Sequence, residues 1–221
     1  MDSAQLTGRV WAGAIVVAGV LVLLGVTFAV LLGVSQAGTA LLGVLGWLVA
    51  LAAHLPVLGS AGRLHAVRRR DTILAVSSGI TDEVVRLALV VVAVSGFPSA
   101  LWAGFGWALA QLVFISATEL TKFGWPIGQQ AAEQLKAQGG FISTHPAHRA
   151  VRGLTSISFH LGATLLLTAG PWWVPATAAS HAVVNVGFAR WAGKRLVPVE
   201  LFGAVVSVVL LLAGLFASIP G

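Results

Sequence analysis

Seven long apolar segments run along the chain, and they constrain its fold more than any other feature. Each is close to the roughly 20 residues that a helix needs to cross a bilayer. None alternates polar and apolar residues with the two-residue period of a strand. The sequence therefore predicts an all-α bundle of about seven transmembrane helices, in a single integral-membrane domain over residues 1–221. The expected limits are 10–34, 38–58, 72–95, 100–118, 153–168, 174–189 and 197–218.

The charged residues support this class and suggest an orientation. Only 9% of the residues are charged, against about 25% in a soluble domain. Of the 13 lysines and arginines, 12 fall in regions that a seven-span topology places on one side, and the other is Arg86. By the positive-inside rule the N-terminus is cytoplasmic and the C-terminus outside, in the cytoplasmic (inner) cell membrane. This placement also accounts for the net charge of +6, so we expect a lipid bilayer and no nucleic acid as partner.

The third segment is unusual because it carries three charges near its middle, on Asp82, Glu83 and Arg86. An ionisable side chain at the bilayer centre costs about 2.5–3.5 kcal/mol on insertion scales. Glu83 and Arg86 are three residues apart, so they share a helical face and can compensate each other. Asp82 points about 100° away and needs another partner. The stretch is either a structural ion pair between packed helices or a polar site inside the membrane.

Three later segments place polar side chains at a similar depth, in pairs four residues apart that share a helical face. Polar groups at this depth normally face the bundle interior or a wet cavity. We therefore expect a functional cavity, to which His54, near the end of the second segment, is a weaker contributor. The pairs are Trp107 with Gln111, His160 with Thr164, and His181 with Asn185.

General-base hydrolysis is the chemistry that such a set permits. A desolvated Glu83 can take a proton from water, with Arg86 orienting its carboxylate. The histidines and Asn185 can stabilise an oxyanion. Alternatively, Glu83, His160 and His181 could hold a divalent metal such as zinc, although their spacing is not the HExxH arrangement. Proton or ion movement along the same groups is a third possibility.

Three short motifs, in order, resemble a known family. The first is Gly79-x-x-Asp82-Glu83-x-x-Arg86, the second is His160 with Thr164 four residues on, and the third is His181-Ala182-x-x-Asn185. They resemble the YhfC family of proposed intramembrane peptidases, which is related to the CAAX-protease and bacteriocin-processing (CPBP) superfamily and to the PrsW proteases. The resemblance covers about residues 38 to 190, with Asp82 where the family has Glu and Thr164 where it has Ser.

A further family motif, Gly-His-Gly-x-x-Glu, is altered here. The corresponding stretch is Gly106 to Gln111, with Trp107 in place of the His and Gln111 in place of the Glu. A candidate ligand or oxyanion donor and a second carboxylate are therefore missing. Gln111 can still form hydrogen bonds but cannot act as a base.

The resemblance implies an intramembrane peptidase whose substrate is a peptide or membrane-protein segment that reaches the middle of the bilayer. Two alternatives remain: a catalytically inactive scaffold that binds a partner, and a small ion-coupled transporter. In the first reading Glu83 is the general base, with His160, His181 and Asn185 as its partners. The supporting residues are Asp82, Arg86, Gln111 and Thr164.

For the segments between the apolar runs, the sequence predicts structural roles rather than catalytic ones. The long loop from 118 to 152 contains a polar stretch, 129–136, that predicts an amphipathic helix on the inner membrane surface. His65, His145 and His148 are interpreted as solvated loop histidines rather than metal ligands. The two tryptophans of Pro171-Trp172-Trp173 are typical of a membrane–water interface.

Overall fold

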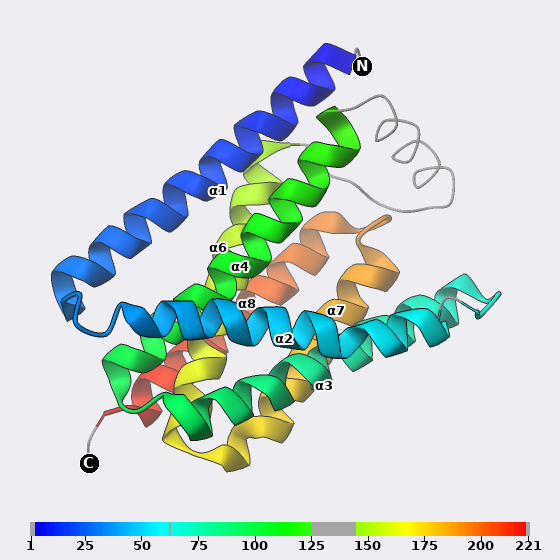
Figure 1. Cartoon of the computed structure of the whole chain (residues 1–221). Helices are drawn as coiled ribbons and strands as arrows, with labels where there is room; N and C mark the ends of the chain where they lie inside the picture. Colours follow the sequence, from blue (N-terminus) through cyan, green and yellow to red (C-terminus); the bar gives the residue numbers. More distant parts are fainter. Residues whose placement is uncertain (1–2, 62, 125–144, 220–221) are drawn as a thin grey trace.

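The computed structural model describes residues 3–61, 63–124 and 145–219. Within these ranges all of the regular structure is helical, which confirms the predicted all-α class (Figure 1). A short 3-10 helix, η1 (Pro171–Trp173), lies between α6 and α7. The long helices are α1 (Ser3–Leu32), α2 (Gly38–Ala61), α3 (Val67–Ala93), α4 (Phe97–Gly124), α6 (Pro146–Ala169), α7 (Val174–Trp191) and α8 (Leu196–Ala217).

Each of the apolar segments expected from the sequence is a helix, in the same order. Two helices begin earlier than expected by the same length of chain: α1 begins at Ser3 rather than at 10, and α6 begins at Pro146 rather than at 153. Proline is well suited to the first helical position, because the backbone N–H that it lacks would have no partner within the helix there. The His145 ring accepts a hydrogen bond from the backbone N–H of Ala147. The amphipathic helix expected over 129–136 lies outside the described residues.

One of the loop histidines, His148, was therefore placed wrongly by the sequence pattern, whereas His145 is exposed and lies just before the helix. His145 caps α6, and His148 lies within its first turn. The Nδ1 atom of His148 is 2.6 Å from Oε2 of Glu200 on α8, so this ring is paired rather than solvated. His65 is exposed, as expected.

Five helices, α1, α2, α4, α6 and α8, are long and apolar enough to cross a membrane. This is the pattern of a multi-pass membrane protein. The two remaining long helices, α3 and α7, carry the polar groups that the sequence singled out: Asp82, Glu83 and Arg86 on α3, and His181 on α7, all of them buried.

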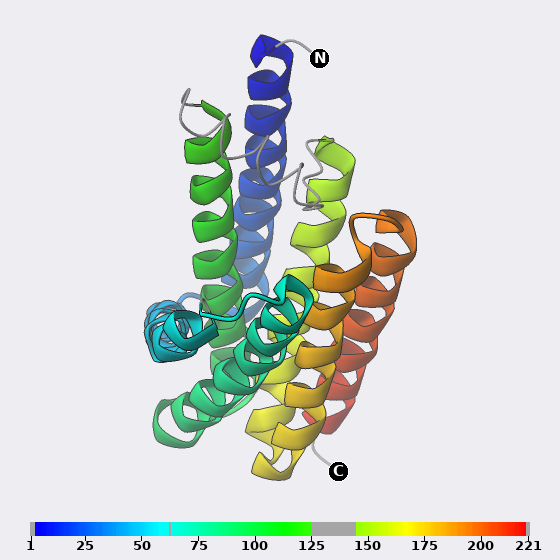
Figure 2. The same ribbon diagram turned by 90° about the vertical axis from the view of Figure 1, so that its right-hand side faces the viewer.

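The two ends of the chain lie at opposite ends of the bundle (Figures 1 and 2). Helices α1, α4, α6 and α8 run alongside one another, whereas α2 crosses α4 and is seen almost end-on in Figure 2. Helix α3 packs against both α2 and α7, and α6 packs against α4 and α8. Helices α3 and α7 therefore pack against each other and are flanked by the apolar helices α2 and α8.

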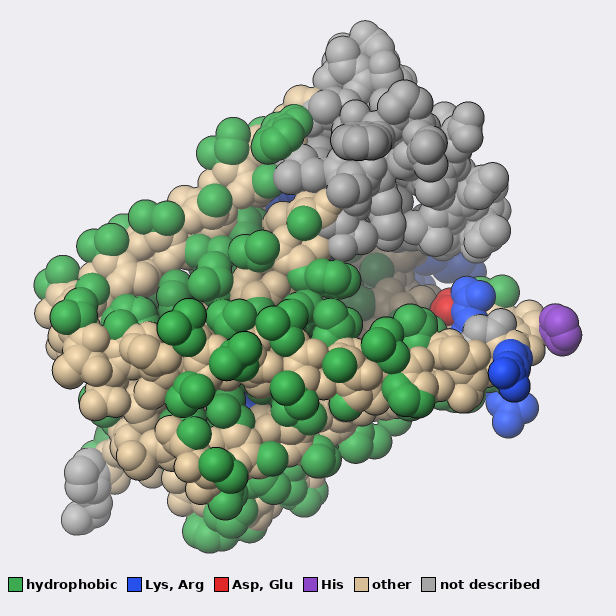
Figure 3. Space-filling view, viewed as in Figure 1, with side chains coloured by type: hydrophobic (Ala, Val, Ile, Leu, Met, Phe, Trp, Pro, Cys, Tyr) green, Lys and Arg blue, Asp and Glu red, His purple; other side chains and the backbone are tan. Residues whose placement is uncertain are grey.

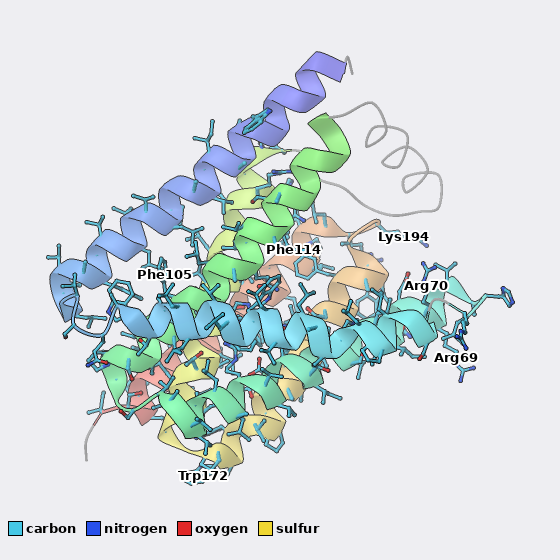
Figure 4. All side chains as sticks on the ribbon, in the orientation of Figure 1. Arg69, Arg70, Phe105, Phe114, Trp172 and Lys194 are labelled. Carbon is cyan, nitrogen blue, oxygen red and sulfur yellow. The ribbon has the colours of Figure 1, made fainter. Side chains whose placement is uncertain are left out.

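Apolar side chains cover the outer face of the bundle, whereas basic side chains gather at one end of it (Figure 3). Arg69, Arg70 and Lys194 lie at that end, and Trp172 lies at the other (Figure 4). Trp172 is 71% exposed in the turn between α6 and α7. Its position agrees with the expected role of the two tryptophans at a membrane–water interface, which stays a prediction.

Two glycines set the helix contacts that position the polar residues. A Cβ on Gly79 would lie 2.6 Å from the backbone nitrogen of Ala182 on α7. A Cβ on Gly104 would lie 2.9 Å from the carbonyl oxygen of His160 on α6. Small residues at such crossings let helix backbones approach closely in membranes. The consequence is that α3 meets α7, and α4 meets α6, at the depth of the polar side chains.

Candidate functional site

A fully buried ion pair on α3 is the centre of the site. Glu83 and Arg86 are one turn apart, and the side chains of both have 0% exposure. Arg86 Nε donates to Glu83 Oε2 at 3.1 Å, and Arg86 Nη2 donates to Oε1 at 3.3 Å. Burying two charges is costly unless the pair is well aligned and its remaining donors are also satisfied. The contacts of Arg86 with other helices provide acceptors for its remaining N–H donors.

Arg86 reaches across the bundle to α6 and α4. Its Nη1 donates to Thr164 Oγ1 at 3.1 Å and approaches the carbonyl oxygen of His160 at 3.5 Å. Its Nη2 lies 2.8 Å from His160 Nδ1. The guanidinium carbon is 4.1 Å from the ring centre of Trp107, a cation–π contact. Trp107, which stands where the family motif has a histidine, is thus one of the side chains that surround Arg86.

These contacts fix the tautomer of His160. A guanidinium group only donates hydrogen bonds, so Nδ1 of His160 must accept and carries no proton. The proton of the neutral ring is therefore on Nε2, which donates to Gln111 Oε1 at 2.5 Å. The hydroxyl of Ser156 donates to the same oxygen at 2.7 Å. Both ring nitrogens of His160 are thus engaged inside the protein.

His181 is held from one side only. Its Nδ1 lies 3.0 Å from Glu83 Oε1, and because a carboxylate accepts, the proton is on Nδ1. Its Nε2 is 3.8 Å from Asp82 Oδ2, which is too long for a hydrogen bond. Asn185, one turn further along α7, places its Nδ2 3.5 Å from the carbonyl oxygen of Ala75. His181 therefore presents an Nε2 that can accept a proton.

A cavity of about 320 Å³ lies beside these residues. It extends between α4, α6 and α7, with contributions from α1 and α8. Neither Glu83 nor Asp82 is among its lining residues. Its polar end is lined by Gln111, Ser156, His160, His181 and Asn185. Its apolar walls are formed by Val17, Leu112, Ile115, Phe159, Val184 and Phe188. Arg149 and Arg152 line the opposite end.

The structure brings most of the predicted site residues into one network. Arg86 joins Glu83 to His160 and Thr164, Gln111 holds His160, and the rings of His160 and His181 have centres 5.8 Å apart. Asp82 is more loosely attached, through its 3.8 Å approach to His181. Asn185 lines the cavity without contacting the ion pair. The buried Nδ1 of His54 has no hydrogen-bond partner within the described part of the chain.

The geometry does not suit the expected metal set. In the described ranges, no three His, Asp or Glu side chains are grouped so that they could hold a metal ion. The physical reason is that Arg86 stands between Glu83 and His160, and both nitrogens of His160 are already bonded. A divalent cation would have to displace the guanidinium group from the site.

Sequence reasoning missed several members of the site. Ser156 lies four residues before His160, a spacing that puts it on the same face and could have revealed it. Arg149 and Arg152 were assigned to a loop as part of the topology signal, but they lie on α6 and line the cavity. Glu200, which pairs with His148, had no visible partner until α6 was known to begin at Pro146.

Comparisons with family models, with curated proteins and with solved structures found no match. The resemblance to the YhfC family therefore stays a prediction that rests on the motifs alone.

Proposed function

We propose that the protein is an intramembrane peptidase in which His181 is the general base and Glu83 holds it in position. The observation that carries this proposal is the 3.0 Å contact between Glu83 Oε1 and His181 Nδ1, beside a cavity that the ring of His181 lines. A carboxylate that holds the Nδ1 proton of a histidine leaves Nε2 free to take a proton from a nucleophile.

This assignment gives Glu83 a different role from the general base that the sequence suggested. Both of its oxygens already accept hydrogen bonds, from Arg86 and from His181. It is also fully buried and does not line the cavity. Glu83 therefore acts through His181, and we expect it to orient the ring and to stabilise the positive charge that the ring gains during proton transfer.

The proposed reaction is hydrolysis of a peptide bond by water. His181 Nε2 takes a proton from a water molecule, whose oxygen attacks the carbonyl carbon of the substrate. The resulting oxyanion collapses, the bond to nitrogen breaks, and the proton on His181 passes to the leaving amine. The amide nitrogens of Gln111 and Asn185 are the candidate donors to the oxyanion, because Gln111 Oε1 already accepts from Ser156 and His160.

The topology proposed with this function has seven crossings, the N-terminus in the cytoplasm and the C-terminus outside, in the cytoplasmic membrane. It is supported by the opposite positions of the two chain ends (Figure 2) and by the separation of the basic side chains Arg69, Arg70 and Lys194 from Trp172 (Figure 4). Helices α3 and α7 cross despite their polar residues because those residues face inward. The substrate is a peptide or membrane-protein segment that enters from the bilayer.

One observation favours a second function, a catalytically inactive protein that binds a partner in the same cavity. Trp107 and Gln111 replace a histidine and a glutamate of the family motif, and here they serve to pack and bond Arg86 and His160. A polar network that satisfies itself in this way can stabilise a fold without performing chemistry.

Hydrolysis of a peptide library by the purified protein in proteoliposomes separates these functions. We expect His181→Ala to lower the rate at least about 100-fold, the usual contribution of a general base. His65→Ala is the matched control, since His65 is exposed and lies outside the cavity. Equal rates for the two variants would overturn the proposal. A folded wild-type protein that cleaves nothing but binds a peptide would support the second function, and a proton flux across sealed liposomes would indicate an ion-coupled transporter.

A further inference from the structure

Two arginines of α6 line the end of the cavity that lies away from the histidines. Arg149 and Arg152 are three residues apart, in the first two turns of the helix, and so share a face. They precede His160 by eight or more residues, a distance of about 12 Å or more along the helix axis. The hydrolytic mechanism proposed above makes no use of either side chain.

The fold accommodates both side chains closely. Arg149 is only 4% exposed and lies against α1, where a Cβ on Gly13 would overlap its Cδ. The side chain of Arg152 is 32% exposed, and its Nε is 3.9 Å from Glu200 Oε1. The other oxygen of Glu200 is bonded to His148 at 2.6 Å. Arg149 and Arg152 thus both line this end of the cavity, and Glu200 lies beside Arg152 and is shared with His148.

An apolar wall continues from the arginines toward the surface of the bundle. It consists of Val17 on α1 with Leu112 and Ile115 on α4. Ile115 is also 41% exposed, so the wall reaches the outer, apolar face of the molecule. The cavity volume of about 320 Å³ is near the lower end of the range for small-ligand sites, about 300–1,000 Å³. This volume includes the histidine end of the cavity, so the arginine end has room for a phosphate group, and the hydrocarbon chain would continue past Ile115 toward the outside of the bundle.

We propose that this end of the cavity binds an anionic phospholipid, with its phosphate between Arg149 and Arg152 and one acyl chain along Val17, Leu112 and Ile115. Guanidinium groups match phosphate oxygens in charge and geometry. Basic pockets between membrane helices are a common form of acidic-lipid site. Arg149 and Arg152 lie in the first two turns of α6, near the end of a membrane helix, where lipid headgroups are expected to lie. This site goes beyond the proposed hydrolysis and does not depend on it.

Native mass spectrometry of the full chain in detergent tests this site by titration with phosphatidylglycerol, phosphatidylcholine or inorganic phosphate. We expect one phosphatidylglycerol molecule to be retained at roughly tenfold lower concentration than phosphatidylcholine. Arg152→Gln should raise that concentration roughly fivefold, since one basic side chain near an acidic lipid is worth about 1 kcal/mol. The matched control is Arg69→Gln, because Arg69 is exposed but does not line this cavity.

A second variant leaves both arginines in place. Ile115→Asn makes the half-exposed part of the wall polar, and we expect it to weaken retention of phosphatidylglycerol as well. His181→Ala, which removes the proposed base, should leave retention unchanged and so separates this site from the catalytic proposal.

Several results would overturn the lipid site. Equal retention of the two lipids would show that the site does not distinguish an anionic headgroup from a zwitterionic one. An equal effect of Arg69→Gln and Arg152→Gln would show general surface attraction. Displacement of the lipid by inorganic phosphate, or by a short acidic peptide bound more tightly, would assign the arginines to a free anion or to a peptide.

Discussion

Oε1 of Glu83 on α3 lies 3.0 Å from Nδ1 of His181 on α7, across 98 residues of sequence. The same carboxylate is paired with Arg86, whose guanidinium group holds His160. A change at any of these residues should therefore affect both the stability of the bundle and the chemistry at His181.

Glu83→Gln should strongly destabilise the protein. It leaves the buried charge of Arg86 without its counter-ion, and breaking one half of a buried pair typically costs about 3–5 kcal/mol. The free energy of unfolding in mixed micelles, measured by denaturant titration, checks this. Asp82→Asn is the control, because the nearest approach of Asp82 to His181 is 3.8 Å and its loss should cost clearly less. An equal or larger cost for Asp82→Asn would contradict the assignment of Glu83 as the centre of the network.

Gln111→Leu should cost about 1–3 kcal/mol, because it leaves the donors of the buried His160 and the half-buried Ser156 without their shared acceptor. Ser156→Ala removes only one of these donors and should cost less. The comparison needs thermal unfolding of both variants in the same detergent. A neutral Gln111→Leu would mean that His160 Nε2 does not donate to this side chain.

Gly79→Ala should push α3 away from α7, because its Cβ would lie 2.6 Å from the backbone nitrogen of Ala182. Overpacking of this kind costs about 1–3 kcal/mol, and here it also separates Glu83 from His181. We expect both stability and hydrolytic rate to fall. Gly19→Ala is the control, since a Cβ there meets nothing within 4 Å. Full activity of Gly79→Ala would show that the close contact of α3 and α7 is not needed.

Trp107→Leu should destabilise the protein by about 2 kcal/mol or more, because it removes a desolvated cation–π contact with Arg86. Trp107→Phe keeps an aromatic face above the guanidinium group and should recover part of that loss. The unfolding free energies of the two variants test whether Trp107→Leu destabilises the protein more than Trp107→Phe does. Identical values for Leu and Phe would show that Trp107 only fills space.

The absence of cysteine from the sequence makes the proposed topology easy to test. Single cysteines at Lys194 and at Ser218 lie after α7 and α8 respectively. We expect a membrane-impermeant thiol reagent to label Ser218→Cys in intact cells, and Lys194→Cys only after the membrane is opened. The reverse pattern would invert the orientation, and labelling of both in intact cells would contradict a single crossing of the membrane by α8 between the two positions.

Much of the fold could be predicted because long apolar runs permit few structures in lipid. The pairing of Glu83 with Arg86 also followed from their spacing, since residues three apart share a face whatever the surroundings. By contrast, the start of α6 was predicted too late because the polar residues around Arg149 and Arg152 resemble a loop. Their burial depends on α1, which lies more than a hundred residues earlier in the chain.

The internal arrangement of the site could not be predicted from periodicity. A face of α3 can be assigned from the sequence, but the rotation of α7 against it depends on the contact of Gly79 with Ala182. That rotation decides that His181, and not Glu83, lines the cavity. In the same way, the cation–π contact of Trp107 with Arg86 depends on how α4 crosses the bundle.

The central claim is that Glu83 holds the Nδ1 proton of His181 and leaves Nε2 unprotonated. Solid-state ¹⁵N NMR of histidine-labelled protein in bilayers measures this directly, with His181→Asn used to assign the signal. We predict a neutral ring protonated at Nδ1 that disappears in the variant. A ring of His181 protonated at Nε2 instead would contradict the account.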